Sequence, residues 1–150
     1  MPSSSPGVRR VLLALMLAFA PAPVLAQSRP YIPPRGSVER QQIMEAFRVP
    51  VARYFGRAVI FQHVVLRVQD GWAFVQAEPR TPAGGEAADL HDPRCQPNCT
   101  EVAIALLRWN RGRWSVVRHA VSPGEYPREW QSQFRAVPQA VWPWNWPSVN

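Results

Sequence analysis

The chain has 150 residues and a formal net charge of +7, and all seventeen of its basic residues are arginine. Because lysine is absent, Schiff-base chemistry and lysine nucleophiles are excluded, since both need an amine that can lose its proton near neutral pH. This length suits one domain with one core. The positive charge favours encounters with anionic neighbours such as lipid head groups, cell-wall polymers and acidic proteins.

The amino terminus has the three parts of a secretory signal peptide. Arg9 and Arg10 precede the apolar run Val11–Ala20, and small residues suited to cleavage end at Ala26. A membrane-spanning helix needs about twenty apolar residues, and two prolines interrupt this run before that length is reached. We therefore predict a signal peptide over residues 1–26, no transmembrane anchor after cleavage, and a mature protein that is periplasmic or secreted.

One helix is predicted after an extended, proline-rich lead-in over residues 27–36. Ser37 is a good N-cap for this helix. Apolar residues at intervals of three or four then form one stripe, which consists of Ile43, Phe47, Val51 and Tyr54 or Phe55. Pro50 lacks a backbone donor, so we expect a kink or a short break near Val49 before the helix ends at Gly56.

A β-hairpin is predicted next. The β-branched run 58–69 and the shorter run 72–78 flank Asp70-Gly71, a pair typical of hairpin turns. Alternation places four residues near one face of the first strand, namely Ile60, Val64, Leu66 and Val68. Two adjacent valines, at positions 64 and 65, blur this alternation and leave room for a bulge.

A long loop follows over residues 79–100, beginning where Pro79 is expected to end the returning strand. The loop holds Cys95 and Cys99, which are expected to form a disulfide in an oxidising compartment. The alternative is a metal site, because His91, Cys95 and Cys99 recur every four residues. Prolines within the loop argue against the helix that such a site would need. We expect no cofactor.

A second hairpin is predicted over Glu101–Val121, where two apolar runs flank a short turn. Gly112 can supply the positive φ that this turn needs. We expect the hairpin to form the centre of a sheet, with Trp114 as an anchor in the core.

The remaining elements complete an α+β fold. A short helix is predicted over Tyr126–Phe134, with Trp130 and Phe134 on the same side, and a tail rich in Trp and Pro occupies residues 137–150. One helix followed by four strands in two hairpins favours an antiparallel sheet with the helix across one face. We therefore predict a single domain over residues 37–136, built on a curved four-stranded sheet.

The element order and two sequence segments, GWAFVQ and ALLRWNRGRWSVV with its Gly-x-Trp-x-Val, resemble small NTF2-like or cystatin-like α+β proteins that bacteria export. The likeness covers roughly residues 37–121. NTF2-like enzymes place a His or Asp inside a cone-shaped cavity as a general base, so the resemblance implies a small-molecule binding or catalytic domain as one alternative. His63 or His119 would then pair with a carboxylate. The candidate carboxylates are Glu78 and Glu101.

The other alternative, which the sequence favours, is a binding domain without catalytic activity. No nucleophile elbow, phosphate-binding glycine loop or His-Glu-x-x-His motif occurs. The candidate binding residues lie at the second turn and in the tail, and they are Trp109, Arg111, Arg113, Trp142, Trp144 and Trp146. We expect an envelope component, a protein or an anionic surface as partner, and no nucleic acid. The tail tryptophans either dock on the sheet and complete the core or form an exposed patch.

Overall fold

The computed structural model describes residues 29–82 and 102–146. Its elements are α1 (Val38–Phe55), β1 (Ile60–Gln69), β2 (Trp72–Arg80), β3 (Ala103–Asn110), β4 (Arg113–Val121), the short helix α2 (Glu129–Gln133) and the 3-10 turns η2 (Gln139–Val141) and η3 (Pro143–Asn145). The expected signal peptide, disulfide and metal site fall outside the described residues. The same is true of four candidate residues, His91, Cys95, Cys99 and Glu101.

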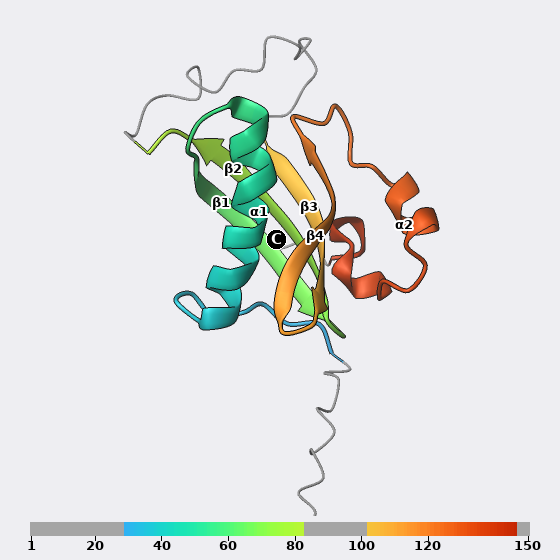
Figure 1. Ribbon diagram of the computed structural model, residues 1–150. Coiled ribbons are helices and arrows are strands. Elements are labelled where there is room, and N and C mark those ends of the chain that lie inside the picture. The colour runs from blue at the N-terminus through green and yellow to red at the C-terminus, as the bar shows by residue number, and fades with distance from the viewer. Residues whose placement is uncertain (1–28, 83–101, 147–150) are drawn as a thin grey trace, which may run out of the picture.

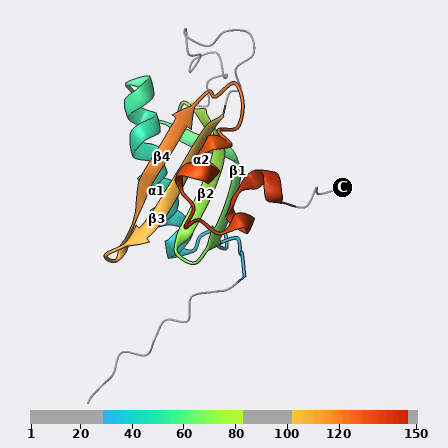
Figure 2. The ribbon, with the colours of Figure 1, turned by 90° about the vertical axis from the view of Figure 1, so that its right-hand side faces the viewer.

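The four strands form one antiparallel sheet in the order β1-β2-β3-β4. α1 covers one face of this sheet, and the segment from α2 to η3 lies on the opposite face (Figures 1 and 2). The predicted α+β architecture, with one helix packed on a four-stranded antiparallel sheet, is therefore confirmed. The second hairpin, however, is not central. In a meander of two hairpins the middle of the sheet is the contact between β2 and β3, so β4 lies at an edge.

The ends of α1 lie where the sequence predicts them. The Ser37 side chain accepts a hydrogen bond from the backbone N–H of Arg40, and Gly56 ends the helix in the left-handed conformation with φ of 67°. Of the two expected effects of Pro50, a kink or a short break, the break is absent, because α1 is one continuous helix. Buried side chains at Phe47 and Val51, on either side of the proline, hold both halves against the sheet and so offset the lost backbone bond.

Both predicted turns are confirmed, and they lie at the same end of the sheet. Asp70 and Gly71 have φ of 50° and 73°, and Arg111 and Gly112 have φ of 51° and 78°, the geometry of two-residue type I′ turns. The backbone N–H of Trp109 donates to the carbonyl of Gly71 over 2.8 Å. This bond joins the β3 end of one hairpin to the turn of the other.

A bulge in β1 changes which side chains face the helix. The register shifts by one residue between Gln62 and Val65, where His63 has φ of 48°. A bulge is therefore confirmed close to the valine pair, and Phe61 rather than Ile60 packs toward α1. The placement of Ile60 on the face of Leu66 is wrong, because the extra residue moves every position before it to the opposite face.

β2 continues one residue past Pro79, to Arg80, so the prediction that this proline ends the strand is wrong. Pro79 pairs with Phe61 of β1, whereas β3 pairs with β2 only as far as Ala77. Among the described residues, Pro79 therefore has a ladder partner on the β1 side only. A missing N–H is tolerated at such a position, because it can face the side that has no ladder.

The sheet has a core on each face. The core under α1 includes Trp114, which confirms the predicted anchor. The core on the opposite face combines Phe74 of β2 with residues of β3 and of the C-terminal segment, and its other members are Ile104, Leu106, Trp130, Val137, Val141 and Trp142. Within the described residues, no helix has both the length and the apolar character needed to cross a membrane.

Candidate functional site

The end of the sheet at the β3–β4 turn brings together three of the predicted binding residues. Trp109, the penultimate residue of β3, is 40% exposed, and its ring centroid lies 5.7 Å from that of the buried Trp114. Arg111 occupies the turn and Arg113 begins β4, and both side chains are exposed. The two arginines line an open hollow of about 310 Å³ together with Asn110 and Ser115. An exposed indole thus sits beside two guanidinium groups on a rigid hairpin.

Arg108 belongs to the same end of the sheet, although the sequence-based set of binding residues does not include it. Its guanidinium lies 4.7 Å from the ring centroid of Trp72, its cross-strand neighbour, and donates to the backbone carbonyl of Asp70 over 2.8 Å. In the described parts of the chain, no carboxylate forms an ion pair with Arg108, Arg111 or Arg113. Arg108 lies opposite Trp72 in the pairing of β2 with β3, and this position could have marked it as a binding residue. The sequence alone does not give that pairing.

The tail docks on the sheet, which is the first of the two alternatives left open by the sequence. Trp142 is fully buried, and its ring stacks on Trp144 with 5.2 Å between centroids. Two 3-10 turns replace the extended conformation that would point all three tryptophans to one side. Trp144 and Trp146 remain half-buried, and the guanidinium of Arg67 lies 4.5 Å from the ring centroid of Trp146.

The structure pairs two of the candidate catalytic residues, His63 and Glu78. His63 Nδ1 lies 2.9 Å from Glu78 Oε2, and Arg80 donates to the same oxygen over 2.9 Å. The bulge in β1 places the imidazole there. The His63 side chain is 73% exposed, however, so the pair lies at the surface of the sheet rather than in the enclosed cavity that the catalytic alternative needs.

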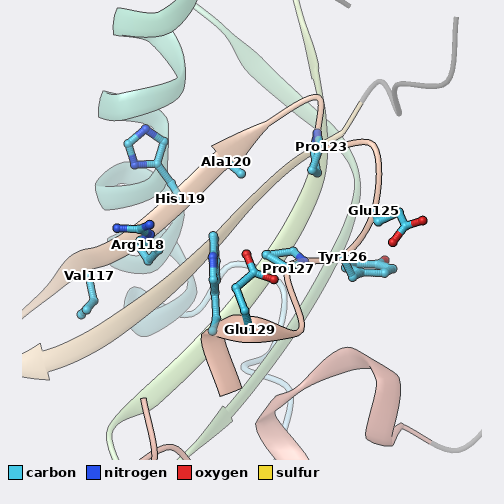
Figure 3. A pocket seen from close by; sticks show the side chains of 10 residues that line it. Val117, Arg118, His119, Ala120, Pro123, Glu125, Tyr126, Pro127 and Glu129 are labelled. Atoms are coloured by element: carbon cyan, nitrogen blue, oxygen red, sulfur yellow. The ribbon is translucent and has the colours of Figure 1, made fainter. Parts of the chain in front are cut away.

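His119, the other candidate base, lines an open hollow of about 640 Å³ between β4 and the segment that leads into α2 (Figure 3). A bulge at Val117 in β4 places His119 opposite Ala105, on the face of the sheet that α1 covers. Figure 3 shows Glu129 on the other side of the strand, approaching from α2. Among the described residues, which do not include Glu101, no carboxylate forms an ion pair with His119. Burial lowers the pKa of His119, and Arg118 and Arg53 lower it further by charge repulsion.

We expect His119 to titrate below the ordinary histidine value of about 6.5. Because folding lowers this pKa, the unfolded chain takes up the proton first as the pH falls. The effect of His119 on stability is therefore absent well above pH 6.5, becomes destabilising as the pH falls through the unfolded value of about 6.5, and stops growing once the pH is below the folded pKa. An NMR titration of the imidazole protons checks this prediction. Arg118→Gln should raise the midpoint, and an unperturbed midpoint in the unchanged protein would contradict the expectation.

No protein-family model, curated protein or solved structure matches this chain. The resemblance to NTF2-like or cystatin-like proteins therefore remains a prediction. A helix on an open antiparallel sheet is compatible with many functions, so the functional conclusion has to come from specific side chains.

The chemistry of the two surfaces differs. The His63–Glu78 pair has the groups for proton transfer, but among the described residues it lies at the surface, with the His63 side chain 73% exposed. The β3–β4 end has no proton-transfer group among its lining residues and offers guanidinium donors and an aromatic face. Such groups bind carboxylate or phosphate and flat apolar surfaces.

Proposed function

We propose that the chain is an exported, non-catalytic binding domain whose ligand surface is the end of the sheet at the β3–β4 turn. The observation that supports it most directly is the 40% exposure of Trp109 beside two exposed arginines that no described carboxylate neutralises. Trp and Arg are enriched among the residues that dominate binding energy at protein interfaces. The ligand is an envelope component or a protein that carries anionic groups.

The rigidity of this end also supports the proposal. The type I′ turn fixes the backbone of Arg111 and Gly112, and the ring of Trp114 packs beneath that of Trp109. A backbone that is already fixed loses little conformational entropy on binding. The tail has a different role, because Trp142 serves as a core residue that covers the sheet.

Capture from an envelope fraction tests the proposal. The immobilised chain is expected to retain a ligand that is lost when Trp109→Ala, Arg111→Gln and Arg113→Gln are combined. The matched control is the double variant His63→Gln/His119→Gln, which should retain it. Circular dichroism establishes that both variants fold. Equal capture by the triple variant and the unchanged chain would overturn the proposal.

The second candidate is a small-molecule binding or catalytic domain of the NTF2-like type. The contact of 2.9 Å between His63 Nδ1 and Glu78 Oε2 is the observation that favours it. This alternative predicts the reverse pattern in the same experiment. The histidine variant would then lose the ligand, whereas the variant at the β3–β4 turn would retain it.

A further inference from the structure

Exposed apolar side chains gather at the end of the molecule that carries the β3–β4 turn. Besides Trp109, this end displays Ile32, which is 60% exposed, and Val38, which is 69% exposed and is the first residue of α1. Tyr31 forms a β-bridge with Val68 near the end of β1, which fixes the segment that contains Ile32. Figures 1 and 2 show both hairpin turns, this segment and the start of α1 at the same end.

Val38 and the β3–β4 hairpin form one continuous surface. Val38 lines a shallow groove of about 540 Å³ together with Arg113 and Trp114. The groove therefore connects the start of α1 with the start of β4. Val38 and Trp109 thus lie close to the arginines of the turn, whereas Ile32 lies at the same end of the sheet but beside β1, at the opposite edge.

The same end is rich in arginines that form no ion pair with a carboxylate among the described residues. Arg35 is exposed just before α1 and joins Arg111 and Arg113. Burial lowers the pKa of Arg40, and repulsion from Arg35 lowers it further. Arg48, halfway along α1, differs from these arginines because it forms an ion pair with Glu45 of the same helix.

Two carboxylates, those of Glu39 and Asp70, lie near this end and offset part of that charge. Glu39 accepts a hydrogen bond from the Tyr31 hydroxyl over 2.8 Å. Burial raises the pKa of Tyr31, and this hydrogen bond and the negative charge of Glu39 raise it further. Asp70 lies at the β1–β2 turn, where its backbone carbonyl accepts from Arg108. The balance among the described residues of this end remains positive.

We infer that this end of the molecule docks on the surface of an anionic phospholipid bilayer, an inference that rests on the proposed function and names its ligand. Guanidinium groups bind lipid phosphates, and each basic residue near an anionic surface adds to the attraction. Tryptophan favours the membrane–water interface, where its ring is apolar and its N–H is hydrated. The exposed Val38 and Ile32 can enter the same shallow layer. A soluble polyanion would use the arginines but not these apolar side chains.

Co-sedimentation with vesicles tests the inference. The full chain is expected to bind vesicles that contain both phosphatidylglycerol and phosphatidylcholine, and not to bind vesicles of phosphatidylcholine alone. High salt should release the bound protein. Arg111→Gln and Arg113→Gln should each weaken binding about fivefold. Arg53→Gln is the matched control, because it removes the same charge from the last turn of α1. Equal weakening by all three variants would overturn the inference, since it would indicate net charge rather than a surface.

Val38→Ser distinguishes a bilayer from a soluble polyanion. Because Val38 is exposed, this variant is expected to fold, and circular dichroism checks that it does. It should weaken vesicle binding and leave binding to inorganic polyphosphate unchanged. Binding to polyphosphate without binding to vesicles would overturn the inference. Loss of vesicle binding alone, with envelope capture still dependent on Trp109 and its neighbouring arginines, would overturn the bilayer as ligand and leave the proposed function standing.

Discussion

Trp142→Ala is expected to lower the free energy of unfolding by about 3–5 kcal/mol, the usual cost of removing a large buried aromatic side chain. Trp142 is fully buried in the core opposite α1, where it contacts the ring of Phe74 and stacks on Trp144. Alanine would leave a cavity under the tail. Urea denaturation monitored by circular dichroism measures the loss, which should appear as a lower midpoint with an unchanged slope.

Two further variants separate packing from other roles of the tail. Trp142→Phe should cost much less, because Trp142 Nε1 has no hydrogen-bond partner among the described residues and the ring would still fill most of the space. Truncation after Pro138 should cause a large fall in melting temperature, because it removes both Val141 and Trp142 from the core. Unchanged stability combined with lost ligand capture would contradict the docked role and assign the tail to the ligand.

The elements of this fold could be predicted because their signals are local. The cap at Ser37, the left-handed glycine at the end of α1 and the Asp70-Gly71 turn each depend on a few neighbouring residues. The helix stripe likewise needs only its own periodicity. Two hairpins and one helix then leave few ways to bury the apolar faces.

The conformation of the tail depends on a surface that forms only in the assembled sheet. Trp142 docks on a face built from Phe74, Ile104 and Leu106, which come from two strands. One sequence signal did bear on this outcome. The run Ala103–Leu107 is apolar at every position and buried throughout, which is typical of a strand covered on both faces. Because α1 can cover only one face of the sheet, this pattern indicates that another segment covers the opposite face.

Which candidate residues contact one another depends on strand register, and register could not be predicted from the sequence. His63 and Glu78 were both candidates, but their contact depends on the bulge that shifts β1 against β2. A second bulge, at Val117, turns Arg118 to the face of Leu106 and His119 to the face of α1. The position of a bulge depends on packing across strands, and the amino-acid pattern of one strand does not fix it.

Phe47→Ala is expected to cost about 3–5 kcal/mol in the free energy of unfolding, because Phe47 anchors α1 to the other face of the sheet. Its side chain is fully buried, and its ring stacks on Phe61 of β1 with 4.6 Å between centroids. Val49→Ala is the matched control, since Val49 is two positions away in α1 and 58% exposed, and it should change stability by no more than about 0.5 kcal/mol. Chemical denaturation of both variants measures the difference. Because Phe47 also helps to hold the helical turn before Pro50 against the sheet, the alanine variant should lose helical signal at lower urea concentration. Equal stability of the two variants would contradict this account of how α1 is held.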